Sequence, residues 1–214
     1  MEMKTNEKIA LLFGILLGDG CLSRFGRAYH IAIAGHKIDD KLFLDDTAKL
    51  IKSLINKDVK IRNRKRNTIA IAFSNKNLFL LLKEKGFPVG KKGPNLLIPN
   101  IFPSEMYKFI VQGYFATDGC LVLTDNNGIL YPRIEFSSIS KNLLEQVLKY
   151  LRSKGMFGKI YISHKYNNGF YTLYRIQCNG KKNLETFAKE IGFVNPKHKE
   201  KFKLFKEKSA GTGI

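Results

Sequence analysis

The stretch that decides the fold reads LFGILLGDGCL over residues 12–22, and a second copy, VQGYFATDGCL, covers residues 111–121. Each copy is an apolar run that closes with Asp-Gly and continues with the same Cys-Leu pair. The two aspartates, Asp19 and Asp118, are 99 positions apart (118 − 19 = 99). Runs of this length fall short of the roughly 20 apolar residues that a membrane span needs. The duplication instead favours two matching helices inside one globular fold.

Small residues recur at every fourth position of both runs. Gly14 and Gly18 share one helical face in the first copy, and Gly113 and Thr117 share it in the second. Glycine inside a helix costs about 0.5–1 kcal/mol relative to alanine, so a repeated glycine needs a structural reason. A face without bulky side chains lets two helices approach closely. We therefore expect the two helices to pack together through these four residues.

The two aspartates are predicted to lie where these helices end. We expect Gly20 and Gly119 to close the helices in the left-handed conformation. Helix C-termini expose unpaired carbonyl oxygens and carry the negative end of the helix dipole. Two such ends with Asp19 and Asp118 suit a hard cation such as Mg²⁺, which prefers oxygen ligands. A lone Asp-Gly is usually only a turn, and it is the second copy that favours a paired site.

The composition points to a polyanionic partner. The 214 residues include 37 Lys and Arg against 18 Asp and Glu, a formal charge of +19, and the basic residues are dispersed along the chain. Such a charge fits nucleic acid, although charge alone fits ribosomal, RNA-binding and membrane-surface proteins equally well. Three cysteines without a CxxC pair indicate a reduced protein without structural zinc. We expect it in the cytoplasm, the nucleoid or an organelle matrix, with no secretion signal.

The order of predicted elements repeats along the chain. Residues 1–90 are expected to run helix, hairpin, helix, hairpin, helix, with Asn6 capping the first helix. A connection over residues 91–103 precedes the same order over residues 104–214. The sequences KEKGF at 83–87 and KEIGF at 189–193 mark the same place in both halves. Each half is thus predicted as α-β-β-α-β-β-α with a four-stranded antiparallel sheet, an α+β fold, and the tail from residue 209 is expected to fray.

The two motif copies resemble the LAGLIDADG motif, and the chain is similar to single-chain, two-repeat LAGLIDADG homing endonucleases from about Glu7 to about Phe205. The motif glycine falls on Gly14 and Gly113, the acid on Asp19 and Asp118, and the final glycine on Gly20 and Gly119. A second, more variable acidic position of the family holds Leu17 and Ala116 here. The resemblance implies pseudo-symmetric halves packed through the motif helices, a monomer that forms an internal pseudo-dimer. Its two sheets would form a saddle over the major groove of double-stranded DNA.

The same resemblance implies a function. It predicts a site-specific, intron-encoded endonuclease that hydrolyses both strands of a long asymmetric target with divalent metal. Asp19 and Asp118 would bind two or three Mg²⁺ ions, for which Mn²⁺ can substitute, with the carbonyls of Gly18 and Thr117 as backbone ligands. Lys91 and Lys197, each five residues after the glycine of KEKGF or KEIGF (Gly86 and Gly192), and His36 complete the implied catalytic set. Lys92 and Lys199 are neighbouring candidates for the lysine positions.

Basic and polar residues of the predicted hairpins are candidates for reading DNA, because Arg, Lys, Gln and Asn recognise base edges in the major groove. They are Arg24, Arg27, Lys60, Arg62, Arg64, Arg133, Lys159, Tyr161, Arg175 and Gln177. Two alternatives use the same scaffold: an RNA maturase that binds intron RNA, and a DNA-binding regulator that does not cut. Retention of both aspartates favours cleavage. No membrane partner is expected.

Overall fold

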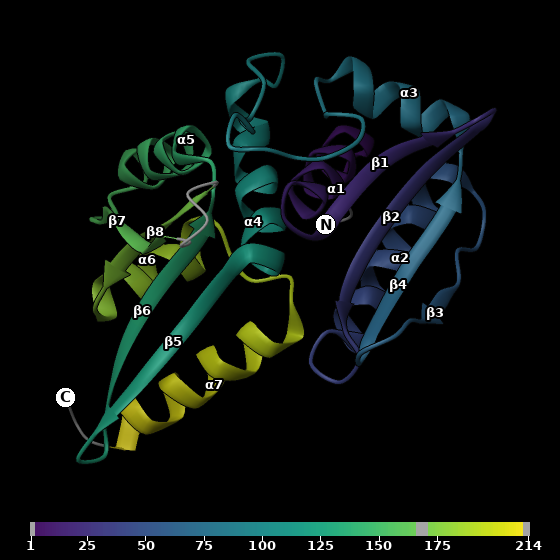
Figure 1. The fold of residues 1–214 in the computed structure, drawn as a ribbon. Coiled ribbons are helices and arrows are strands. Elements are labelled where there is room, and N and C mark those ends of the chain that lie inside the picture. Colours follow the sequence, from purple (N-terminus) through teal and green to yellow (C-terminus); the bar gives the residue numbers. More distant parts are fainter. Residues whose placement is uncertain (1–2, 166–170, 212–214) are drawn as a thin grey trace. The chain divides into compact units, whose positions relative to one another are not determined.

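The protein is described by a computed structural model that covers residues 3–165 and 171–211 (Figure 1). It divides into two compact units. Unit 1 comprises Met1–Lys92 and Pro99–Thr117, and unit 2 comprises Gly93–Ile98 and Asp118–Ile214. The predicted boundaries at residues 90 and 104 follow the sequence repeat. The packing division differs from them because the second motif helix packs against the first, within unit 1.

Unit 1 contains one antiparallel sheet with helices on one of its faces. The strands lie in the order β1-β2-β4-β3. Ile31 and Ile33 of β2 and Ile71 of β4 are fully buried on the covered face, and Figure 1 shows α2 lying along it. The elements are α1 (Thr5–Asp19), β1 (Gly20–Phe25), β2 (Ala28–His36), α2 (Lys41–Ile55), β3 (Ile61–Asn63), β4 (Thr68–Ser74), α3 (Lys76–Glu84), the 3₁₀ turn η1 (Ser104–Met106) and α4 (Tyr107–Asp118).

Unit 2 repeats this arrangement. Its strands lie in the order β5-β6-β8-β7, the same connectivity as in unit 1. Ile134, Phe136 and Ile176 are fully buried on the face that α5 and α6 cover. The match confirms the predicted α+β class and its two α-β-β-α-β-β-α repeats. The elements are β5 (Gly119–Asn126), β6 (Ile129–Ser138), α5 (Lys141–Ser153), β7 (Lys159–Lys165), β8 (Thr172–Asn179), α6 (Lys181–Glu190) and α7 (Pro196–Gly211).

Within unit 1, α1 and α4 touch backbone to backbone. A Cβ built on Gly14 would lie 2.8 Å from the carbonyl carbon of Ile110, and one built on Gly113 would lie 2.8 Å from the nitrogen of Ile15. Gly113 also lies directly against the carbonyl oxygen of Leu11. Ile110 and Gly113 are Leu11 and Gly14 displaced by the repeat of 99 positions. The two contacts are therefore pseudo-symmetric copies of one another, as in a two-fold interface.

Gly20 and Gly119 do not adopt the left-handed conformation that was expected. Gly20 is extended, with φ −104° and ψ 165°, and it is the first residue of β1; Gly119 begins β5 in the same way. Glycine is needed at residue 20 for closeness rather than for a positive φ. A Cβ there would lie 2.6 Å from the Cα of Leu16. The chain thus passes from helix to strand without a left-handed residue.

Two expected helix boundaries are also wrong. The first helix begins at Thr5, so Asn6 lies inside its first turn, and the N–H of Lys4 is bonded to Oε2 of Glu7 at 2.7 Å instead. Residues 209–211, expected in a frayed tail, belong to α7, which was not predicted at all. Phe205 explains that helix, because its side chain is 2% exposed in the core of unit 2.

None of the described helices combines the length and apolarity that crossing a membrane would take.

Candidate active site and nucleic-acid interface

The two motif aspartates end two helices. Asp19 is the last residue of α1 and Asp118 is the last residue of α4, and both side chains are exposed. The residue before each, Gly18 or Thr117, is half-buried, and the glycine after each is buried. The repeated sequence is thus matched by a repeated local environment, in which a carboxylate is presented to solvent at the negative end of a helix.

Lys92 caps the end of α1. Its Nζ donates to the carbonyl oxygens of Leu16 at 3.0 Å and Leu17 at 2.9 Å, and to that of Gly18. These carbonyls belong to the last turn, where oxygens lack helical partners, and a cation there also offsets the helix dipole. Lys91, the first candidate for this basic position, has an exposed side chain. The structure thus brings Lys92 to the motif.

The end of α1 fits a hard divalent cation. Three carbonyl oxygens converge on the ammonium of Lys92, and the exposed carboxylate of Asp19 follows in the chain. The bonds of Lys92 show that this set of oxygens attracts positive charge, and an all-oxygen donor set suits Mg²⁺. Among residues 3–165 and 171–211, no three His, Cys, Asp or Glu side chains gather as a metal site. The fit therefore depends on carbonyls and single carboxylates.

In unit 2 another lysine bonds a strand that follows a motif helix. Lys201 of α7 donates from Nζ to the carbonyl oxygen of Leu121 in β5 at 3.1 Å. The predicted Lys197 is half-buried near the start of α7, where its N–H bonds Oδ1 of Asn195, and Lys199 is exposed. Sequence reasoning missed Lys201 because it missed α7. The signal was present: Pro196 suits a first helical turn, and no Gly or Pro follows until residue 211.

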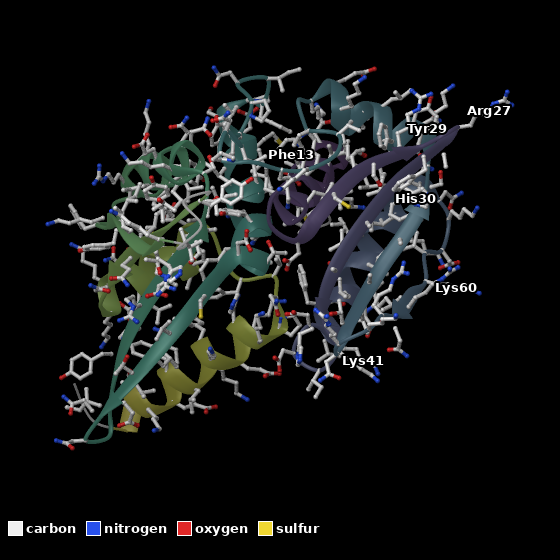
Figure 2. The ribbon with its side chains drawn as sticks, in the orientation of Figure 1. Phe13, Arg27, Tyr29, His30, Lys41 and Lys60 are labelled. Carbon is white, nitrogen blue, oxygen red and sulfur yellow. The ribbon has the colours of Figure 1, made fainter. Side chains whose placement is uncertain are left out.

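The predicted DNA-reading residues of unit 1 lie in different places. Arg62 of β3 is opposite Ala70, on the sheet face away from Ile31 and Ile71, which we call open face 1. Arg24 is opposite Tyr29 on the covered side, with its guanidinium carbon 5.0 Å from the Tyr29 ring centre. Figure 2 shows Arg27 at the tip of the β1–β2 hairpin. Lys60 and Arg64 flank β3 and are exposed.

His36 lies at the end of β2, opposite Thr68. Its Nδ1 is 3.0 Å from Oδ2 of Asp39, and its backbone N–H bonds the carboxylate of Asp40 at 2.9 Å. The side chain is 44% exposed, so it is within reach of solvent and of a bound ligand. Ser138 ends β6, where the strand register aligns it with Gly35 rather than with His36, and its Oγ accepts a hydrogen bond from the N–H of Ser140 at 2.9 Å.

All five predicted readers of unit 2 share one face. The strand register places Arg133, Arg175 and Gln177 opposite the covered face of Ile134 and Phe136. Lys159 pairs with Gln177 and Tyr161 with Arg175 across β7 and β8, so both belong to the same face, which we call open face 2. At its centre is a residue that the sequence did not single out, Glu135, which is 6% exposed.

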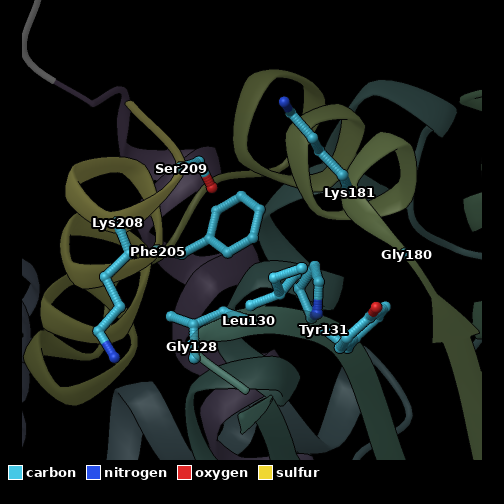
Figure 3. A pocket seen from close by; sticks show the side chains of 10 residues that line it. Gly128, Leu130, Tyr131, Gly180, Lys181, Phe205, Lys208 and Ser209 are labelled. Carbon is cyan, nitrogen blue, oxygen red and sulfur yellow. The ribbon is translucent and has the colours of Figure 1, made fainter. Parts of the chain in front are cut away.

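A hollow of about 330 Å³ lies elsewhere in unit 2 (Figure 3). It is bounded by the start of β6, the start of α6 and the last turns of α7. Figure 3 shows the Phe205 ring reaching into it beside Ser209, and Lys181 and Lys208 also line it. None of the described residues that line it is acidic. We interpret it as the margin of the α7 packing rather than as a reaction site.

Comparison with known proteins finds a family match in the second repeat and a shared fold over most of the chain. Residues 105–192 match the family model of the LAGLIDADG-like domain. No curated protein sequence matches the chain. Over most of its length the fold matches solved homing endonucleases: mesophilic variants of I-DmoI (17% identity, TM-score 0.64, 88% of this chain and 92% of that one) and I-LtrWI bound to target DNA (12%, 0.62, 95% and 89%). I-CpaMI bound to uncleaved DNA is also similar (13%, 0.57, 93% and 90%).

Residues 105–192 are thus similar to a LAGLIDADG-like domain, and the chain has the fold of the single-chain homing endonucleases. The domain match at residues 105–192 contains the second motif copy, and the first copy carries the equivalent residues 99 positions earlier. Other structures of I-DmoI contain DNA with Ca or with Mn.

Proposed function

We propose that the protein is a metal-dependent, site-specific endonuclease that cuts both strands of DNA. The observation that carries the proposal is the duplicated helix end: α1 and α4, packed through Gly14 and Gly113, each finish in an exposed aspartate. One carboxylate for each DNA strand is the arrangement that double-strand cleavage requires. The fold is that of homing endonucleases whose structures hold target DNA.

DNA binding is assigned to the two open faces. A two-stranded or larger antiparallel ribbon fits the major groove, where Arg, Lys and Gln recognise base edges. Open face 2 gathers Arg133, Arg175 and Gln177, and open face 1 offers Arg62. The charge of +19 supplies the attraction to phosphates that positions the protein on the duplex. Because the two faces differ in sequence, the target is a long site without strict two-fold symmetry.

Asp19 and Asp118 are the proposed metal-binding carboxylates, with the carbonyls of Gly18 and Thr117 beside them. A divalent ion bound there supplies Lewis-acid activation of water and of the leaving oxygen. Lys92 and Lys201 hold positive charge near the motif ends of the two repeats, where it offsets the charge that develops on the phosphate. His36, Lys91 and Lys197 remain predictions for ordering water and balancing charge.

A randomised library of double-stranded DNA, incubated with protein and Mg²⁺, tests the proposal. Recovery of one long, asymmetric cut site, lost when Mg²⁺ is replaced by EDTA, is the expected result. Failure to cut any sequence, with Mg²⁺ or Mn²⁺, contradicts it. Structured intron RNA, added as a competitor, tests the alternative function of an RNA maturase. RNA that binds more tightly than every duplex would show that RNA is the substrate. Intron encoding and an intracellular location are proposed on the same resemblance.

A further inference from the structure

Glu135 is a buried carboxylate on a face that the proposed function gives to DNA. Its side chain is 7% exposed, whereas the neighbouring Arg133 and Arg175 side chains are 34% and 35% exposed. A buried charge is costly unless it is paired, and a carboxylate facing a polyanion adds repulsion. An acid at this place therefore calls for an explanation beyond a solvated strand surface.

Three side chains of open face 2 converge on this carboxylate. Arg133 Nε and Gln177 Nε2 donate to Oε1 at 2.6 and 3.0 Å, and Nη1 of Arg175 lies 3.5 Å from Oε2. Arg133 comes from the same strand, whereas Gln177 lies directly across on β8 and Arg175 lies two residues before Gln177. The acid thus contacts three of the five predicted DNA-reading residues of open face 2.

These bonds leave the arginines able to bind something else. Glu135 engages Arg133 through Nε, so the two Nη groups of Arg133 keep their donors. The distance of 3.5 Å between Nη1 of Arg175 and Oε2 of Glu135 is too long for a full hydrogen bond. A pair of guanidinium donors matches O6 and N7 of guanine, which is the commonest specific contact in the major groove. Fixing the arginines before binding reduces the side-chain entropy lost on association.

Open face 1 lacks this cluster. The strand registers of the two sheets align Glu135, Ser137, Arg175 and Gln177 with four alanines: Ala32, Ala34, Ala70 and Ala72. Gly20 of β1 pairs with Ile33, and the equivalent Gly119 of β5 pairs with Phe136. This pair aligns β2 with β6, and the pairing of each with its other neighbour then aligns β4 with β8. The cluster therefore belongs to one repeat only, although the surrounding scaffold is duplicated.

We infer that Glu135 is a positioning residue that sets guanine specificity in one half of the target, by holding Arg133 and Arg175 in place for base recognition. The inference rests on the proposed function, because it requires DNA on open face 2. It does not require cleavage, so binding alone tests it.

The test measures binding of a randomised duplex library by the full chain in Ca²⁺, comparing the unchanged protein, Glu135→Gln and Glu145→Gln. The control removes the same charge from an exposed acid of α5, which pairs with Lys141 at 3.3 Å and lies off the sheet. We expect Glu135→Gln to lower guanine discrimination about tenfold at a few positions of one half-site, and to leave the other half unchanged. Affinity for random DNA should stay equal or rise, since a negative charge is lost.

Arg133→Lys provides a second variant, because lysine keeps the charge but loses the planar pair of donors. It should relax the same positions, and thermal unfolding of every variant checks folding. An unchanged base profile for Glu135→Gln, or a loss that is uniform over all sequences and both halves, overturns the inference. If the unchanged protein prefers no duplex sequence, the proposed function fails and the inference falls with it; a clear preference that Glu135→Gln does not alter refutes the inference alone.

Discussion

Gly14 lies directly against the backbone of Ile110, so that a Cβ on Gly14 would come within 2.8 Å of the Ile110 carbonyl carbon. The repeat generates the same contact between Gly113 and Leu11. Only residues without a Cβ allow this approach on both sides. The motif glycines are therefore explained by packing, and the aspartates five residues further on are placed by the helices that this packing holds.

Gly14→Ala should destabilise the protein. Alanine favours a helix over glycine by about 1 kcal/mol, but its methyl group would overlap the α4 backbone, and backbone cannot rotate away as a side chain can. We expect a net loss of about 1–3 kcal/mol in the free energy of unfolding. Thermal and urea unfolding measure it, with Gly93→Ala as the control, because an added Cβ there meets nothing within 4 Å. Equal stability of both variants would contradict the contact.

Lys92→Met and Lys91→Met separate two neighbouring lysines. Lys92 bonds the terminal carbonyls of α1, whereas the Lys91 side chain is exposed. Losing a charged donor to these carbonyls should cost about 1–2 kcal/mol of stability and lower the single-turnover cleavage rate. Lys91→Met should change stability little. The reverse order of effects, in thermal unfolding and in cleavage, would assign the basic role to Lys91.

Cys178 should resist thiol reagents in the folded protein. Burial raises the pKa of its thiol to about 11 from an ordinary 9.0, against a smaller lowering effect of Arg152. The folded state thus holds the proton more tightly than the unfolded state. Stability from this group is complete below pH 9 and falls as the pH rises toward 11. At pH 8 a chromogenic disulfide should label the half-buried Cys21 and Cys120 first. Equal labelling rates would show that β8 is not packed as described.

DNA binding should depend steeply on salt. The chain carries a net charge of +19, and a protein that contacts about six to ten phosphates loses about a thousandfold or more in affinity between about 50 and 200 mM salt. Titrations with a labelled duplex at several salt concentrations give the slope. A slope near zero would mean that the basic residues do not face phosphates.

The sequence predicted the repeated fold because its signals are local. Ile31 and Ile33 alternate with small residues as in a strand, glycines mark the hairpin turns, and the motif occurs twice. Each of these signals can be read from spacing along the chain. Arg24 shows where such reasoning stops: only the strand register reveals that it lies over Tyr29 on the covered side. The role of Glu135 cannot be predicted from the sequence for the same reason, since its three partners come together only through the pairing of β6 with β8.

The most direct test of the central claim is cleavage by Asp19→Asn and Asp118→Asn on the target recovered from the library. Asparagine keeps the size of aspartate and one of its side-chain oxygens but removes the charge that a divalent ion needs. Each variant should bind the target with nearly unchanged affinity and lose double-strand cutting by about a hundredfold or more, because a metal ligand is lost. Double-strand cutting by either variant at the normal rate would contradict that claim.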